Sequence, residues 1–167
     1  MESWRLVFRD GFAPSLPTKG LAALAEALRT DDQRLTQGST STPPPLMCVQ
    51  DWPVEAACCL AYVGAVECGG FVCTAEEARR AGKLGPPATS NPSAATVGQV
   101  EAFFARVCFE ADQRLGEPAA CRWFQNYWDD TPRNQMFREL LEEVEFELGK
   151  RGVIDPIPLT QGPEDLS

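Results

Sequence analysis

Apolar residues recur at helical spacing along most of the chain. Between residues 15 and 32 they fall at every third or fourth position, which predicts a helix with Thr18 at its N-cap. Longer stripes with the same period predict three more helices, one that begins at Thr96, one over residues 118–130 and one over residues 132–149. The dominant local structure is therefore expected to be α-helix.

One further segment is apolar on all sides. Between Val54 and Val66 the only charged residue is Glu55, while Asp51 and Pro53 before it suit an N-cap and a first helical turn. A helix without a polar face is buried on every side in a protein of globular composition. We therefore expect a central helix that begins near Asp51 and is surrounded by the others.

Two residue pairs mark helix starts more sharply. Thr74 with Glu77, and Thr96 with Gln99, have the spacing of a capping box, in which each side chain bonds the backbone N–H of the other residue. The first pair predicts a short helix over residues 74–82.

Other segments have no helical period. The prolines at 43–45 favour a stiff polyproline II segment, residues 83–95 predict a mobile loop, and residues 151–167 predict an extended or disordered tail. Residues 4–8 alternate apolar and polar side chains, as a strand does. The fold class that follows is all-α: one domain over residues 1–150, an irregular bundle of about five or six helices with a buried central helix and at most one short N-terminal strand.

The chain is acidic. Its 167 residues carry a net charge of -9, and the sequence pI is near 4.5. Such a surface repels phosphate backbones and anionic lipids, so we expect neither nucleic acid nor a membrane as a partner. It attracts basic proteins instead. The longest apolar run, residues 56–66, is too short to span a bilayer, and the N-terminus does not resemble a signal peptide, so we expect a cytoplasmic protein.

The chain has seven cysteines and no histidine. This composition excludes a Ser–His–Asp triad, a Cys–His pair and imidazole metal ligands. The sequence also lacks a CxxC pair and the glycine motifs that bind phosphates, so we expect no metal and no cofactor. The odd number of cysteines predicts free thiols, mostly buried, rather than disulfides.

Four aromatic residues crowd into residues 122–130. On a helix with about 100° per residue, Trp123, Phe124, Tyr127 and Trp128 fall on one side and the polar residues on the other. A ligand site would more naturally mix the two classes, whereas complete separation is typical of a helix that faces a core. We therefore interpret these aromatic residues as core.

The same stretch offers an alternative, a pocket between helices. Asp129 and Asp130 resemble a carboxylate pair for acid–base catalysis or metal binding, although neighbouring helical residues point about 100° apart and converge poorly. Their simpler role is to place negative charge before the next helix. The residues of this alternative site are Arg122, Tyr127, Asp129, Asp130 and Arg133.

Two phenylalanines break the apolar stripes of their helices. Phe109 lies among polar residues in the helix that begins at Thr96, and Phe146 lies among the glutamates of the last helix. Either they pack against another segment, or they anchor a protein partner beside an acidic surface. The candidate partner-binding residues are Phe109, Glu139, Glu142, Glu143, Phe146 and Glu147.

The sequence favours a non-catalytic protein that binds a basic protein, in the manner of an adaptor, an inhibitor, an immunity protein or an antitoxin. Two alternatives remain. One is a small-molecule binder or a histidine-free enzyme that uses the pocket between helices. The other is a structural protein that self-assembles through residues 4–8, and the oligomeric state stays open.

Overall fold

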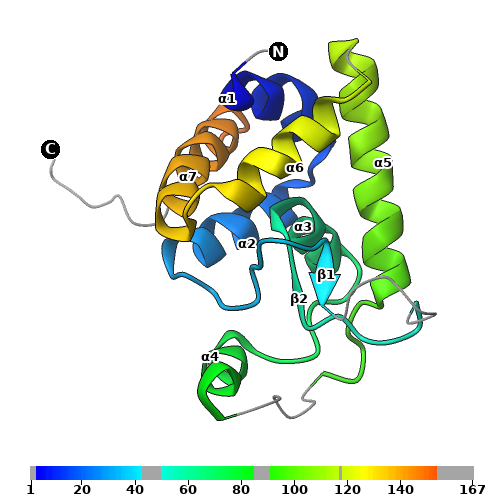
Figure 1. Ribbon diagram of the computed structural model, residues 1–167, viewed down its shortest axis with the longest axis vertical. Coiled ribbons are helices and arrows are strands. Elements are labelled where there is room, and N and C mark those ends of the chain that lie inside the picture. The colour runs from blue at the N-terminus through cyan, green and yellow to red at the C-terminus, as the bar shows by residue number, and fades with distance from the viewer. Residues whose placement is uncertain (1–2, 43–49, 85–90, 117, 154–167) are drawn as a thin grey trace, which may run out of the picture.

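The computed structural model describes residues 3–42, 50–84, 91–116 and 118–153, and this part of the chain is mainly helical (Figure 1). The helices are α1 (Trp4–Val7), α2 (Thr18–Arg29), α3 (Cys59–Glu67), α4 (Ala75–Leu84), α5 (Val97–Leu115), α6 (Ala120–Asp130) and α7 (Arg133–Lys150). The shorter elements are a π-helical turn η1 (Phe8–Phe12), a 3-10 turn η2 (Ala13–Ser15) and the antiparallel strands β1 (Ser41–Thr42) and β2 (Ala56–Ala57). The prediction of an all-α fold is confirmed. None of the described helices is long and apolar enough to cross a membrane.

Helix α3 is the centre of the bundle. Every residue from Cys59 to Ala65 is buried, and α3 contacts both α2 and α5. The prediction of a buried central helix is confirmed, but the predicted start near Asp51 is wrong. The chain before α3 is extended because its backbone bonds to other segments; the Ala57 N–H, for example, donates to the Arg34 carbonyl at 2.8 Å.

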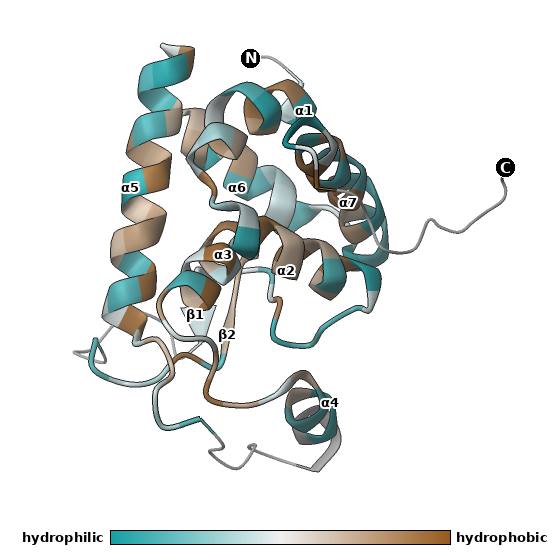
Figure 2. Ribbon diagram, turned by 180° about the vertical axis from the view of Figure 1, so that it is seen from behind, coloured by the Kyte–Doolittle hydropathy of each residue, from teal (hydrophilic) through white to brown (hydrophobic). Residues whose placement is uncertain are grey.

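Two glycines let α3 lie close to its neighbours. A Cβ atom at Gly64 would come within 2.6 Å of the Phe103 ring on α5, and a Cβ atom at Gly20 on α2 would collide with Val63. Close-packed interiors leave no room for such overlap, so these helix spacings require glycine. Helix α5 carries alternating teal and brown bands in Figure 2, and its residues Val100, Phe103 and Val107 are buried against the bundle, as in an amphipathic helix.

The first residues are helical, which contradicts the predicted N-terminal strand. Trp4, Val7, Phe8 and Phe12 are all buried, and the rings of the three aromatic residues lie 6.2, 5.9 and 5.1 Å from the ring of Phe124. Burial at intervals of three and four residues is the helical period, whereas a strand turns alternate side chains outward. The segment belongs to the core, so the alternative of self-assembly through a free N-terminal strand loses its basis.

A buried glutamate joins this segment to α7. Glu143 is only 1% exposed and accepts hydrogen bonds from Arg5, at 2.7 Å, and from Arg9. Burial by itself would raise the pKa of Glu143, but the two guanidinium groups outweigh burial and hold this pKa below its ordinary value. The carboxylate is therefore charged at neutral pH and holds the N-terminal helical turns on α7.

Two other arginines bind backbone carbonyls of the same segment. Arg114 on α5 donates to the Gly11 carbonyl at 2.7 Å, and Arg151, directly after α7, donates to the carbonyls of Ala13 and Leu16 at 2.8 and 2.7 Å. The N-terminal segment, the end of α5 and the end of α7 are thus held together by hydrogen bonds from guanidinium groups.

Some of the observed helix ends agree with those predicted from the sequence, and others do not. Both predicted capping boxes are formed, with reciprocal hydrogen bonds between Thr74 and Glu77 and between Thr96 and Gln99. Thr18 does not cap α2, because the N-cap position is occupied by Pro17. Helix α7 continues to Lys150, past its predicted end, and is followed by Gly152 in the left-handed region at φ 79°.

Several predicted segments lie outside the described residues. They are the polyproline stretch at 43–45, much of the loop predicted at 83–95, and the tail beyond Val153. Helix α4 extends to Leu84, so the first residues of the predicted loop are helical.

Replacing Gly64 with alanine should destabilise the protein, because the new methyl group overlaps Phe103. We expect a loss of about 1–3 kcal/mol in the free energy of unfolding, measured by urea denaturation. Gly149→Ala is the matched control, since nothing lies within 4 Å of its added Cβ atom. Alanine there should be neutral or stabilise α7 by up to about 1 kcal/mol. Equal stability of the two variants would contradict the close contact between α3 and α5.

Glu143→Gln keeps the size of the side chain but removes the charge that Arg5 and Arg9 bind. We expect a loss of about 1–2 kcal/mol at neutral pH, the scale of a charged hydrogen bond to partly exposed partners. Because the folded pKa is lowered, the wild-type carboxylate stabilises the protein above its unfolded pKa, and this contribution disappears as the pH falls through the folded value.

Denaturation curves for wild type and Glu143→Gln should therefore differ at neutral pH and converge as the pH falls through the lowered pKa of Glu143. Glu142→Gln is the control, because this neighbour also pairs with Arg5 but its side chain is 61% exposed. A stability difference for Glu143→Gln that does not change with pH would argue against the buried ion pair.

Candidate functional site

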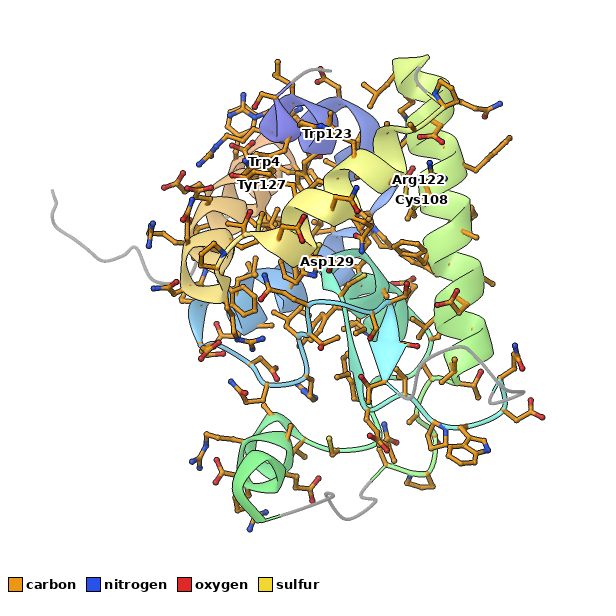
Figure 3. All side chains as sticks on the ribbon, in the orientation of Figure 1. Trp4, Cys108, Arg122, Trp123, Tyr127 and Asp129 are labelled. Atoms are coloured by element: carbon orange, nitrogen blue, oxygen red, sulfur yellow. A yellow bond between two sulfur atoms is a disulfide. The ribbon has the colours of Figure 1, made fainter. Side chains whose placement is uncertain are left out.

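The aromatic cluster of α6 belongs mainly to the core, as its helical arrangement predicts. Phe124 and Trp128 are fully buried, and Trp123 and Tyr127 are partly buried against the same core. The Tyr127 ring stacks on Trp4 at a centroid distance of 5.1 Å, and both are labelled in Figure 3. With this side of α6 facing the core, the candidate site lies on the polar side of the helix.

A pocket of 480 Å³ is found on the polar side of α6, between this helix, α5 and residues 38–40. Its lining includes Arg122 and Asp129, both labelled in Figure 3. Asp130 is exposed and is not part of the lining. Asp129 therefore faces the pocket while Asp130 faces solvent, and the two aspartates do not form the carboxylate pair considered from the sequence.

Two carboxylates of this pocket have unused hydrogen-bonding capacity. Asp112 accepts the backbone N–H of Cys121 at 3.2 Å, and Asp129 accepts that of Gly38 at 2.8 Å. A carboxylate offers about four acceptor positions, so each keeps room for a further donor. The carbonyl oxygen of Gln125, another lining residue, is buried and has no donor in the part of the chain that the structure describes. That oxygen is too deeply buried for a ligand to reach, so the free acceptor positions of the two carboxylates are what favour a ligand with hydrogen-bond donors.

One cation lines the pocket beside these oxygens. The guanidinium of Arg122 has no ion-pair partner within the described ranges of the chain. Two carboxylates, of Asp112 and Asp129, against this single guanidinium leave the lining with an excess of negative charge. The arrangement can bind a cationic group at its carboxylates and, at the same time, offer the N–H donors of Arg122 to an acceptor.

Phe109 adds an exposed apolar surface next to the pocket. It is 63% exposed and precedes Asp112 by about one turn of α5, so the two side chains are neighbours on the helix surface. Phe146 is 46% exposed but lies on α7, with the guanidinium of Arg9 at 4.4 Å from its ring. Figure 1 shows α5 and α7 on opposite sides of the bundle, so the two phenylalanines belong to separate surfaces.

The glutamates of α7 do not form one solvated acidic face. Glu143 and Glu147 are buried, and Glu147 accepts a hydrogen bond from Arg151 at 2.8 Å. Glu139 is partly buried and Glu142 is exposed. The predicted docking surface on the last helix is therefore wrong at Glu143 and Glu147, because arginines from outside the helix neutralise them within the fold.

Arg133 holds the fold together and is not part of the α5–α6 pocket. Its guanidinium donates to the Asp31 carboxylate and to the Leu35 carbonyl, both at 2.8 Å, and so ties the chain after α2 to the start of α7. Of the residues considered for a pocket near the aromatic cluster, Arg122 and Asp129 line this pocket, whereas Tyr127, Asp130 and Arg133 are not among its lining residues.

A disulfide joins α5 and α6 beside the pocket. Cys108 and Cys121 are bonded, their Cα atoms lie 5.2 Å apart, and Cys121 is also a lining residue. The prediction of free thiols is wrong for this pair. The sequence contained an indication of this bond, because both cysteines lie on the apolar sides of helices that a turn at Gly116 folds back on each other.

Three other cysteines are free thiols and are buried, as predicted: Cys58, Cys59 and Cys73. Cys48 lies outside the described residues.

A second pocket, of 360 Å³, is lined by Arg34 and Tyr62 over a buried ion pair. Arg34 donates to Asp32 at 2.8 Å, and the Tyr62 hydroxyl donates to the same carboxylate at 3.2 Å. Burial would raise the pKa of Asp32, but the hydrogen bonds from Arg34 outweigh it and lower this pKa. These charges are satisfied within the fold, so this pocket is a weaker candidate. Across the described residues, no three side chains of the metal-ligating types come together to hold an ion.

No protein-family model matches this chain, and no curated protein and no solved structure shows significant similarity to it. The α5–α6 pocket, with its two partly bonded carboxylates, is therefore the main indication of function.

Thiol reactivity should follow burial. Burial raises the pKa of Cys58 to about 12 and the pKa of Cys59 well above its ordinary value. Cys68 is only partly buried. Of these three thiols, we expect iodoacetamide to modify Cys68 first in the folded protein, with Cys58 and Cys59 protected until urea unfolds it. Peptide mass spectrometry measures the order, and modification of Cys58 as fast as Cys68 would contradict the burial of the start of α3.

Proposed function

We propose that this chain is a non-catalytic binding protein that accepts a basic segment of another protein at the α5–α6 pocket. The observation that carries the proposal is the unused acceptor capacity of two carboxylates that line the pocket, those of Asp112 and Asp129. Lysine and arginine side chains combine a positive charge with several N–H donors, so one such side chain can satisfy more than one of these groups.

The surroundings of the pocket favour a protein as the ligand. Phe109 supplies an exposed aromatic side chain beside the carboxylates, and buried aromatic residues contribute much of the binding energy at protein interfaces. The net charge of -9 attracts a basic partner over a longer range and speeds association. In this proposal the overall charge brings the partner close, and the pocket with Phe109 selects where it docks.

A small zwitterion is the second candidate ligand. Arg122 lies in the same pocket as Asp112 and Asp129 and has no ion pair with the described part of the chain. A molecule with an ammonium and a carboxylate group, such as a free amino acid, would match this combination of charges. The pocket volume of 480 Å³ is within the range of small-molecule sites. A rise in melting temperature with free amino acids, but not with basic peptides, would favour this candidate.

Removing negative charge from the pocket should weaken partner binding. Asp129→Asn and Asp112→Asn each keep an oxygen for the backbone N–H that the aspartate accepts, so both variants should fold. We expect each to weaken binding by about tenfold, the scale of one charged hydrogen bond. Asp130→Asn is the matched control, because it removes the same charge from an exposed position outside the pocket. It should change the Kd by less than about twofold.

The measurement has two steps. Tagged wild-type protein first captures its partner from host lysate at low salt, and mass spectrometry identifies what elutes at high salt. Titration of that partner against each variant then gives the Kd values. Equal weakening by Asp129→Asn, Asp112→Asn and Asp130→Asn would show a general attraction between charges and refute the pocket as the docking site.

A further inference from the structure

The Cys108–Cys121 disulfide lies at the wall of the proposed binding pocket. Cys121 lines the pocket, its backbone N–H donates to Asp112 at 3.2 Å, and the next residue is Arg122, which also lines the pocket. Figure 3 labels Cys108 on α5 and Arg122 on α6. The bond therefore holds the first turn of α6 at the place where two charged groups of the pocket are positioned.

Besides the disulfide, this end of α6 is held by the bond from the Cys121 N–H to Asp112 and by the small buried side chain of Ala120. Its N-cap residue, Ala119, forms no side-chain hydrogen bond. The large buried side chains of the helix, Phe124 and Trp128, lie one and two turns further along. Helix ends leave backbone groups without helical partners and open more easily than helix centres. Without the covalent bond, the first turn of α6 is therefore the part of the helix that opens first.

We propose that this disulfide is a redox switch for the pocket: the oxidised protein holds the binding shape, and reduction releases the first turn of α6 and weakens binding. This inference rests on the proposed binding function. In the reduction step the S–S bond breaks and gains two electrons and two protons, which yields two thiols. A dithiol reductant supplies the electrons and protons and becomes a disulfide itself, and the reverse exchange restores the bond.

Three of the other described thiols compete poorly for exchange with this disulfide, and the fourth, Cys68, is partly buried and is controlled for by the Cys68→Ser variant. Cys58, Cys59 and Cys73 are buried, and burial raises the pKa of each, so they are poor nucleophiles for thiol–disulfide exchange. Cys108 and Cys121 are only partly buried, which leaves their bond open to a small dithiol.

Amide hydrogen exchange on the full chain tests the structural half of the switch without any partner. We expect reduction by dithiothreitol to speed exchange over residues 118–125 by about tenfold or more, with α3 unchanged. The double variant Cys108→Ser/Cys121→Ser should exchange like the reduced protein in the absence of reductant. Cys68→Ser is the control and should exchange like the oxidised wild type. Equal exchange over 118–125 in the oxidised and reduced proteins would overturn the switch.

Binding of a fluorescein-labelled nine-residue arginine peptide, at about 0.15 M salt, tests the functional half. We expect the reduced protein and the double serine variant to bind about fivefold or more weakly than the oxidised protein. Equal affinity of both redox states, while Asp129→Asn still binds more weakly, would overturn the redox control and leave the proposed function standing. Equal affinity of wild type and Asp129→Asn in both states would overturn the proposed function and the switch with it.

Discussion

The burial of α3 on every side is the constraint on which the rest of the structure depends. A helix without a polar face has to be surrounded, so α2 and α5 each turn an apolar stripe toward it. Gly20 and Gly64 set how closely the two helices approach, because a side chain at either position would overlap its neighbour. Since α3 fixes α5 in this way, the placement of α6 on α5 determines the shape of the pocket between them.

The acidic residues of the chain fall into two groups. Some form ion pairs within the fold: Glu143 and Glu147 bind arginines that hold the N-terminal segment and the end of α7. Among the described residues, Asp112 and Asp129 each accept one backbone N–H, and their remaining acceptor positions are available at the pocket. In the proposed function, net charge therefore favours a basic partner, whereas the position of the proposed docking site depends on which carboxylates are already bonded within the fold.

The junction of α5 and α6 contributes both to the stability of the fold and to the proposed binding site. The disulfide closes a loop with a sequence separation of 13, and a cross-link of this span contributes about 3 kcal/mol in the chain-entropy description. The same bond places Cys121 and Arg122 in the pocket lining. A substitution that breaks this disulfide is therefore expected to lower stability and to alter the pocket as well. Both depend on the same contact between α5 and α6.

Most of the longer helices and their buried sides were determined by the sequence alone, because spacing and caps act between residues a few positions apart. The capping box of Thr96 and the separated aromatic residues of α6 are examples. Residues 4–12 also carry a helical spacing, but an overlapping alternation suggested a strand, and only their contact with Phe124 resolves the conflict. The ion pair of Arg5 with Glu143, the Cys108–Cys121 bond and the meeting of Arg122 with Asp112 at one pocket were decided by the tertiary structure. Each joins residues on different helices, and the packing of those helices, not any local pattern, brings them within reach.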